Sequence, residues 1–260
     1  MRKPPFTYVG AKTKLLDLIL REFPPHDTYT EPFGGSGVVL LNKAPAKLEV
    51  FNDLDDAVVN FFEVVRDRVD DFKKVLDLTP YSRGEHDRCV RKINKCDGLE
   101  KARAFYMGIQ SSFNGRFGNT FSVSANPNKN PARKFRTYRD RLHAVAERLR
   151  HVVFENCDGL DVIQMYDRPT TLHYLDPTYL KDSLGKTDPY RFMMEDRQHV
   201  KLVEALLTVK GKVILSGFED DNYARLYAPL KEWRRLVLDH WTMNNKQRKS
   251  HRAEALWMNF

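Results

Sequence analysis

The chain has 260 residues, 42% of them hydrophobic and 30% charged, a balance typical of a folded globular protein rather than a disordered one. Its 43 Lys and Arg residues outnumber its 35 Asp and Glu residues, and the resulting net charge of +8 favours a polyanionic partner. No stretch approaches the ~18 consecutive apolar residues of a membrane span, and no C-x-x-C pair or signal-type apolar run occurs, so we expect a cytoplasmic protein without structural zinc.

The first predicted elements are a short loop and a helix. Residues 6–14 form the loop, and Leu15, Leu16, Ile19 and Leu20 supply the buried stripe of an amphipathic helix that Pro24 ends. Lys12 stands just before this helix, next to a glycine and an aromatic residue, which suits an anion or ligand site. A solvated terminal loop is an equally good interpretation of this stretch alone.

A glycine-rich turn follows the first predicted strand. The strand ends in Glu31-Pro32-Phe33, and Gly34-Gly35-Ser36-Gly37 leads into a helix that we expect to begin near Ser36, an N-cap residue type. Glycines let the backbone pass close under a ligand. The pattern is neither G-x-x-x-x-G-K-[ST] nor G-x-G-x-x-G, so a nucleoside triphosphate fits poorly. The next strand, residues 48–51, ends in Asn52-Asp53, where an acid often holds a ribose, and the two strand ends together predict a nucleoside-containing cofactor.

The pattern between residues 61 and 150 is helical, with little strand signal until Phe121, and predicts an inserted module. We assign residues 61–149 to this module, and residues 1–60 and 150–260 to the domain that contains the sheet. Phe113-Asn114-Gly115-Arg116 predicts a tight turn or hairpin whose aromatic and arginine side chains stack on bases or, alternatively, join the core. Lys and Arg dominate residues 129–150, which indicates contact with phosphates or a solvated helix face.

An alternating pattern of strands and helices then resumes. Strands are predicted at 151–154, 172–175, 211–216, 235–238 and 255–258, with a covering helix over 200–207 and a basic stretch over 246–252. Strands that alternate with helices imply an α/β fold with a largely parallel sheet covered on both faces. The strand at 172–175 ends in Asp176-Pro177-Thr178-Tyr179. A carboxylate and an aromatic ring just beyond a strand are placed to act on a ligand, although the same residues also suit a plain turn.

In this order, these stretches resemble the Dam-type DNA adenine-N6 methyltransferases, which use S-adenosylmethionine, and the resemblance covers nearly the whole chain. The motifs that carry it are Tyr8-Val9-Gly10-Ala11-Lys12, Glu31-Pro32-Phe33-Gly34-Gly35-Ser36-Gly37, Asp53, Phe113-Asn114-Gly115, Asp176-Pro177-Thr178-Tyr179 and Glu254-Ala255-Leu256-Trp257. The resemblance implies a Rossmann-like methyltransferase fold, with a mostly parallel seven-stranded sheet, helices on both faces and an inserted helical target-recognition module. It also implies site-specific methylation of N6 of a flipped adenine in double-stranded DNA, without a metal, by a monomer or weak dimer.

The resemblance further implies three sets of site residues. The catalytic residues would be Asp176, Pro177 and Tyr179. The residues that bind S-adenosylmethionine would be Tyr8, Gly10, Lys12, Glu31, Pro32, Phe33, Gly34, Gly35, Gly37, Asp53, Asp158 and Asp176. The DNA-binding residues would be Phe113, Asn114, Arg116, Arg133, Lys134 and Arg136. In such an enzyme Asp176 accepts one hydrogen of the adenine amine, a backbone carbonyl of the turn accepts the other, and Tyr179 stacks on the extruded base.

The chain departs from the family pattern at two positions. Thr178 stands where the family usually has proline, and Arg116 follows Gly115 directly instead of after a short spacer. The second departure means that the recognised DNA sequence cannot be carried over. Two alternatives stay open: a methyltransferase acting on RNA or on cytosine N4, although Asp176 favours adenine over cytosine, and a DNA-binding protein that has lost turnover, which Thr178 permits.

Overall fold

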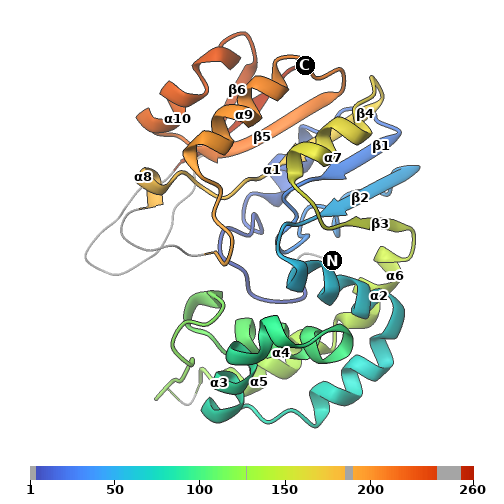
Figure 1. Cartoon of the computed structure of the whole chain (residues 1–260), viewed down its shortest axis with the longest axis vertical. Coiled ribbons are helices and arrows are strands. Elements are labelled where there is room, and N and C mark those ends of the chain that lie inside the picture. The colour runs from blue at the N-terminus through green and yellow to red at the C-terminus, as the bar shows by residue number, and fades with distance from the viewer. Residues whose placement is uncertain (1–3, 127, 185–189, 239–252) are drawn as a thin grey trace.

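A seven-stranded sheet forms the upper part of the molecule in Figure 1. The computed structural model describes residues 4–126, 128–184, 190–238 and 253–260. The strands are β1 (Thr28–Glu31), β2 (Leu48–Asn52), β3 (Val152–Glu155), β4 (Thr171–Leu175), β5 (Lys212–Phe218), β6 (Arg234–Leu238) and β7 (Glu254–Met258). Their order is β3-β2-β1-β4-β5-β7-β6, and all neighbours are parallel except the two pairs that β7 makes. The predicted mostly parallel sheet is confirmed.

Helices cover both faces of this sheet (Figure 1). The helices are α1 (Leu16–Arg21), α2 (Asp56–Asp77), α3 (Arg83–Lys92), α4 (Gly98–Gln110), α5 (Pro131–Arg139), α6 (Leu142–Leu149), α7 (Gly159–Tyr166), α8 (Lys181–Leu184), α9 (Asp196–Leu206) and α10 (Asp221–Leu226), with 3-10 turns η1 (Ile93–Lys95), η2 (Phe113–Gly115) and η3 (Ala228–Leu230). Because side chains alternate along a strand, Leu172 and Tyr174 of β4 join the core cluster under α1 and α2, whereas Leu175 joins the cluster under α7, α9 and α10.

The strand order reverses between β1 and β4. From β1 the chain moves outward to β2 and β3, and it then crosses to β4 on the other side of β1. The loops that follow β1 and β4 therefore diverge and open a crevice at the carboxyl ends of these strands, where open α/β sheets bind their ligands. The Glu31 turn and the Asp176 turn both leave the sheet at this crevice.

The helical part, α2 to α6, lies below the sheet in Figure 1. α2 leads out of β2 and α6 leads back to β3, so the part is inserted between two neighbouring strands. α2 runs unbroken through residue 60 and departs from helical geometry only at Arg68. Phe61 and Phe105 share one core cluster with Phe6 and Tyr174. The helical part is thus packed directly onto the α1 face of the sheet.

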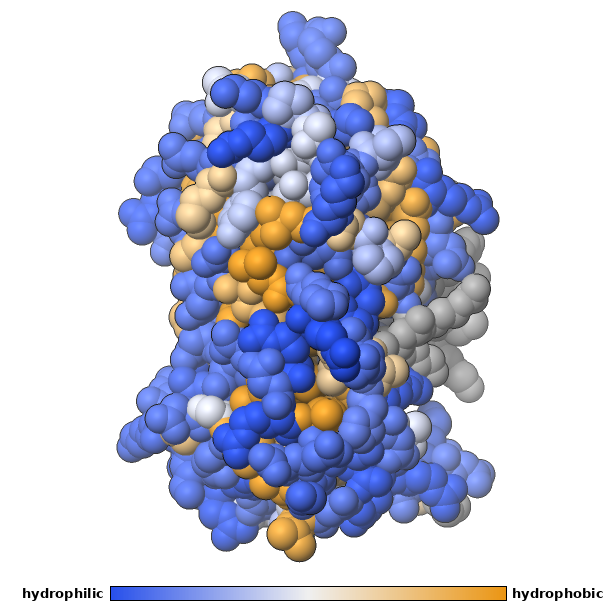
Figure 2. All heavy atoms as spheres, turned by 90° about the vertical axis from the view of Figure 1, so that its right-hand side faces the viewer, coloured by the Kyte–Doolittle hydropathy of each residue, from blue (hydrophilic) through white to orange (hydrophobic). Residues whose placement is uncertain are grey.

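Figure 2 shows hydrophilic residues over most of the face that it presents, with hydrophobic side chains gathered in smaller areas at mid-height. Within the described ranges, no helix is long and apolar enough to cross a membrane.

One predicted helix is wrong. Residues 38–42 form successive turns after the glycines and not a regular helix from Ser36. The N–H of Leu40 donates to the Glu31 carboxylate at 3.0 Å, so it does not make the hydrogen bond to Ser36 O that a helix starting at Ser36 requires. The next amide, Leu41 N, does make a helix-type bond, to Gly37 O at 2.9 Å.

The other predicted elements are found close to their expected bounds. The seven strands, the first helix and the covering helix α9 are confirmed, although Val200 and Leu207 of the predicted apolar stripe are exposed. The segment near Phe121 forms a single bridge with Ser112 and closes the predicted hairpin. The basic stretch at 246–252, Met1-Arg2-Lys3 and Pro127 lie outside the described residues.

Candidate active site

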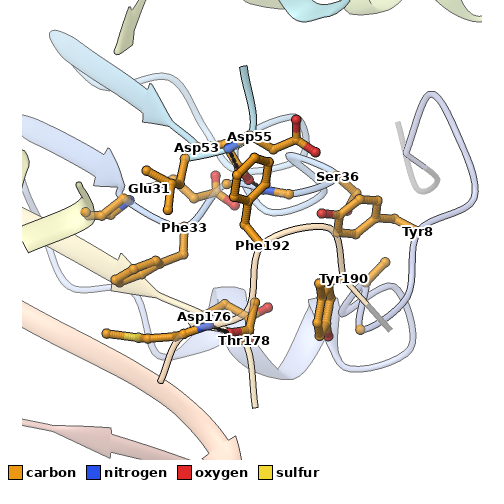
Figure 3. Close-up of a pocket in the computed structure, with 18 of the residues that line it drawn as sticks. Tyr8, Glu31, Phe33, Ser36, Asp53, Asp55, Asp176, Thr178, Tyr190 and Phe192 are labelled. Carbon is orange, nitrogen blue, oxygen red and sulfur yellow. Dashed lines mark hydrogen bonds between the residues drawn. The ribbon is translucent and has the colours of Figure 1, made fainter. Parts of the chain in front are cut away.

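A pocket lies at the carboxyl ends of β1 and β4 (Figure 3). Eleven of the predicted site residues line it: Tyr8, Gly10, Lys12, Glu31, Pro32, Phe33, Gly34, Gly35, Asp53, Asp158 and Asp176. Three predicted residues, Gly37, Pro177 and Tyr179, stand behind its wall. The structure therefore gathers residues from five separate stretches of sequence around one space at the sheet edge where open α/β sheets bind their ligands.

The glycine-rich turn forms the floor of the pocket. Gly35 has a φ of +50°, and a Cβ there would lie 3.0 Å from Cε1 of Tyr8. A Cβ at Gly34 would come within 2.3 Å of the Phe51 ring. Glycine is therefore required both by the backbone conformation and by the close approach of two aromatic rings.

Asp53 stands at one end of the pocket, directly after β2. Its Oδ2 accepts the N–H of Gly35 at 2.7 Å and its Oδ1 accepts the N–H of Asp55 at 2.8 Å. Burial is the main cause that raises the pKa of Asp53 to about 7, and the charge of Asp55 adds to it. The carboxylate thus joins the loop after β2 to the glycine-rich turn, and its raised pKa lies near neutrality.

Asn52, which no motif singled out as a site residue, ties the loops around the pocket together. Its Nδ2 donates to Pro32 O at 2.8 Å and to Cys157 O at 3.1 Å, while its Oδ1 accepts from Cys157 N at 3.0 Å. Asn52 is fully buried. One side chain at the end of β2 therefore fixes the turn after β1 and the turn after β3. The neighbouring Asp158 caps α7 through Leu160 N at 3.0 Å.

Asp176 faces the pocket from the end of β4 and forms an ion pair with Lys12. Nζ of Lys12 lies 2.5 Å from Oδ1 of Asp176 and donates to Oη of Tyr179 at 2.9 Å. Burial raises the pKa of Asp176 above its usual range despite the nearby ammonium. Burial alone would lower the pKa of Lys12, but Asp176 and Glu254 outweigh it and raise that pKa. At neutral pH Lys12 is a fixed cation that shares its protons among buried oxygens.

Tyr179 is already stacked on another ring. Its ring centroid lies 3.8 Å from that of Phe218, with an interplanar angle of 7°. Only 6% of Tyr179 is exposed, and Pro177 is buried beside it. The predicted stacking surface of Tyr179 is therefore covered by Phe218 in this state of the protein.

A loop that sequence reasoning missed, residues 190–194, covers the pocket. In Figure 3 Phe192 lies between Asp53 and Asp176 in the view, and Tyr190 lies beside Tyr8, with ring centroids 6.2 Å apart. The N–H of Met194 donates to Oγ1 of Thr178 at 2.7 Å. The only sequence signal that could have found this loop is its Tyr-Arg-Phe run, which has no periodicity.

Arg191 fastens the other end of this loop. Its guanidinium donates to Asp55 Oδ1 at 2.6 Å and to Asn94 Oδ1 at 2.8 Å, and it lies 5.0 Å from the Phe117 ring centroid. Asn94 and Phe117 belong to the helical part. The covering loop is thus bonded both to the pocket wall and to the predicted recognition module.

The predicted DNA-binding residues form two groups. Phe113, Asn114 and Arg116 lie at the tight turn η2, where Asn114 has a φ of +58° and a Cβ at Gly115 would come within 2.9 Å of Thr7 O. This turn packs on the loop that carries Tyr8. Arg133, Lys134 and Arg136 are exposed on α5, which lies among the lower helices in Figure 1.

Several cations of the basic run at 129–150 are paired with acids of the same chain, one of which is buried. Arg148 is paired with the buried Glu49 at 2.5 Å, Arg139 with Asp77, and Arg150 with Glu147 at 2.7 Å. Among the described residues, no cluster of three or more His, Cys, Asp or Glu side chains is arranged to hold a metal ion.

Comparisons with known proteins bear on this arrangement. A family model described as "D12 class N6 adenine-specific DNA methyltransferase" matches residues 8–229. No curated protein matches the chain. The matched span begins at Tyr8 and includes every residue that lines the pocket as well as the whole helical part.

Proposed function

The chain belongs to the D12 class N6 adenine-specific DNA methyltransferases, and from this premise we propose that its pocket binds S-adenosylmethionine beside Asp176. The family acts on N6 of adenine in DNA, which decides against the cytosine N4 and RNA alternatives. The observation that carries the proposal is the opening of one pocket between Asp53, an acid suited to a ribose, and Asp176, an acid suited to an amine.

The residues present fit this cofactor. A Cβ at Gly35 would crowd Tyr8, so glycine keeps this part of the pocket wall free of a side chain. Asp53 keeps lone pairs for the ribose hydroxyl groups beside its two backbone bonds. Phe33 and Asp158 line the pocket on the β1–β3 side, where we propose that the adenine of the cofactor lies. When bound, S-adenosylmethionine supplies a methyl group activated by a positively charged sulfur.

The chain's own task is to act on the amine of the target base. That amine is a poor nucleophile because its lone pair is delocalised into the ring. We propose that Asp176 accepts one amine hydrogen and that a backbone carbonyl of the turn, fixed by Pro177, accepts the other. Both acceptors favour a pyramidal nitrogen and stabilise the positive charge that builds on it.

The target base must leave the duplex to reach Asp176. Because only 6% of Tyr179 is exposed, an extruded adenine can stack on this ring only after Phe218 or another neighbour moves. We therefore propose that base entry is coupled to a displacement at the Tyr179–Phe218 pair. The hydroxyl of Tyr179 accepts a hydrogen bond from Nζ of Lys12 and so helps to hold this lysine.

We propose that the helical part, residues 61–149 in the sequence-based division, recognises double-stranded DNA in a site-specific way. The exposed cations on α5 are suited to phosphates. The η2 turn is suited to bases because Arg116 lies near Tyr190 of the pocket: burial raises the pKa of Tyr190, and the charge of Arg116 partly offsets that rise. We propose that the enzyme works as a monomer or weak dimer in the cytoplasm of a bacterial or phage-infected cell, where its substrate is.

Replacing Asp176 with alanine tests the proposed site. We expect Asp176→Ala to lower methyl transfer from labelled S-adenosylmethionine to mixed-sequence DNA by ~10²-fold or more, because the acceptor on the amine is lost. Cofactor affinity, measured by calorimetry, should stay within a few fold. Near wild-type turnover in this variant would show that the chemistry lies elsewhere. Absence of turnover in the wild-type chain on any DNA would instead support a binding protein permitted by Thr178.

A further inference from the structure

A cluster of buried polar side chains adjoins Asp176, and Lys12 is the member of it that also lines the pocket. Its members come from distant elements: Lys12 precedes α1, Tyr179 follows β4, Ser216 lies in β5, and Glu254 begins β7. Each is less than a tenth exposed. Glu254 stands in one of the motifs that carry the family resemblance, but the sequence assigned no role to it or to Ser216.

Glu254 is the centre of this cluster. Its Oε1 accepts the hydroxyl of Ser216 at 2.6 Å and lies 3.3 Å from Nζ of Lys12, and its Oε2 accepts the hydroxyl of Tyr179 at 3.2 Å. The antiparallel pairing of β7 with β5, in which Glu254 lies opposite Phe218, brings the carboxylate to this position. A side chain at the end of the sequence is thereby placed against the catalytic turn.

Lys12 is shared between two carboxylates. Its Nζ lies 2.5 Å from Oδ1 of Asp176 and 3.3 Å from Oε1 of Glu254. Within the described part of the chain, no hydrogen bond involves Oδ2 of Asp176. If Glu254 were neutral, the whole charge of a buried ammonium would be balanced by Asp176 alone, and a buried charge draws strongly on its only counter-ion. Asp176 would then accept less readily from the adenine amine.

We propose that Glu254 is a positioning residue for methyl transfer: held by Ser216 and Tyr179, it retains Lys12 so that Asp176 keeps an oxygen for the target amine. This inference rests on the proposed role of Asp176. The division of labour is specific. Glu254 does not line the pocket, and it acts through Lys12 on how much of the Asp176 carboxylate is available to the amine.

The pH dependence of turnover distinguishes this role from simple packing. The groups that face Asp176 electrostatically are Lys12, Glu254, Glu31, Tyr174, Tyr179, Tyr190 and Tyr227. Glu254 raises the pKa of Asp176, and it also competes with Asp176 for Lys12. Removing its charge lowers the pKa of Asp176 on both counts, so the acid limb of the rate profile must move to lower pH.

The experiment compares Glu254→Gln with Glu49→Gln. Glu49 is a matched control because it is equally buried and pairs with a buried lysine, Lys43, at 2.5 Å, but at a site remote from the pocket. We expect Glu254→Gln to lower kcat by about tenfold or more, to leave KM for S-adenosylmethionine within a few fold, and to shift the acid limb to lower pH. Glu49→Gln should lose thermal stability while it keeps kcat and the acid limb.

Each outcome has a defined meaning. Wild-type kcat and acid limb in Glu254→Gln overturn the inference, and so does an equal shift in Glu49→Gln. If Glu254→Gln does not fold, Glu254→Asp decides: it keeps the charge, so a lowered kcat with the acid limb unmoved supports the inference, and wild-type kcat opposes it. Retained turnover in Asp176→Ala would contradict the proposed function itself, which the Glu254 variants alone cannot do.

Discussion

Asp53 has the pKa most directly suited to a solution test. Its pKa is raised to about 7, chiefly by burial, so the carboxylate is present above that pH and is progressively protonated below it. A protonated carboxyl loses the charge-assisted bonds to ribose hydroxyl groups, each worth roughly 1.5–3 kcal/mol. We therefore expect calorimetry to show S-adenosylmethionine binding more weakly as the pH falls from about 8 to about 6.

The Asp53→Asn variant is the control for that titration. It should bind the cofactor weakly at every pH and should lack the pH dependence, because the amide does not titrate. A wild-type Kd that stays constant across the same range would place the ribose away from Asp53.

Thr178 has a use in the structure that proline could not serve. Its Oγ1 accepts the N–H of Met194 at 2.7 Å and so fastens the covering loop to the catalytic turn. A net hydrogen bond contributes about 0.5–1.5 kcal/mol, so Thr178→Val should speed cofactor dissociation by up to about tenfold. Stopped-flow release of the cofactor measures this, and Thr178→Ser, which keeps the hydroxyl, should match the wild type.

The sequence predicted the residues on the pocket wall better than those behind it. Tyr8, Asp53 and Asp176 stand in short motifs whose spacing reports their place at strand ends. The bond from Thr178 to Met194 and the contact of Glu254 with Lys12 depend instead on how distant segments fold together. No local pattern contains that information. The sequence therefore showed that Thr178 departs from its motif, but it did not show that Thr178 bonds to Met194.

At the scale of elements, Asn52 links the turn after β1 to the turn after β3, so replacing it should affect both stability and the pocket. Asn52→Ala would leave Pro32 O and Cys157 N without their buried partners, and each such group costs about 1–3 kcal/mol. We expect a lower thermal midpoint together with weaker cofactor binding. Asn60→Ala removes a comparable bond, from Nδ2 to Gly98 O at 2.9 Å, away from the pocket, and should lower stability alone. Equal cofactor loss in both variants would contradict a specific role for Asn52.

The strands could be predicted because each is a short apolar run bounded by turn residues. The helix expected at Ser36 failed for a tertiary reason: Glu31 takes the Leu40 N–H that a helix would use. Local sequence patterns likewise do not predict the order of the strands in the sheet. The placement of β7 between β5 and β6 is what brings Glu254 to the site, and it follows from pairing over a long sequence separation.

At the scale of the whole molecule, the positive charge has two different uses. The composition favoured a polyanionic partner, and the dense basic run suggested where it binds. The structure divides that run: Arg148 pairs with the buried Glu49 and Arg139 with Asp77 at the surface, whereas Arg133, Lys134 and Arg136 are exposed, Arg136 with only a 3.8 Å contact to Asp77. The sequence alone does not reveal this division, because the partners Asp77 and Glu49 are separated along the chain from Arg139 and Arg148 by more than one helix.

The exposed α5 cations and Arg116 should therefore affect DNA binding differently. Each phosphate contact contributes about 0.9 to the slope of log K against log salt. Replacing Arg133, Lys134 and Arg136 with alanine should weaken binding to all sequences alike and should flatten that slope by up to about three units. Fluorescence anisotropy over a salt series measures both quantities. A slope that does not change would show that α5 faces away from the DNA.

Arg116→Ala carries the opposite expectation. Because Arg116 follows the tight η2 turn and lies near Tyr190 at the pocket, its guanidinium is placed to pair with O6 and N7 of a guanine next to the target base. Loss of such a pair costs about 1–3 kcal/mol at one base and relaxes the preference there, with at most a small change in salt slope. Competition between the matched oligonucleotide and singly substituted ones measures the preference at each position. If Arg116→Ala loses affinity uniformly and keeps the wild-type order of preference, Arg116 contacts a phosphate, and base reading must come from other residues of the helical part.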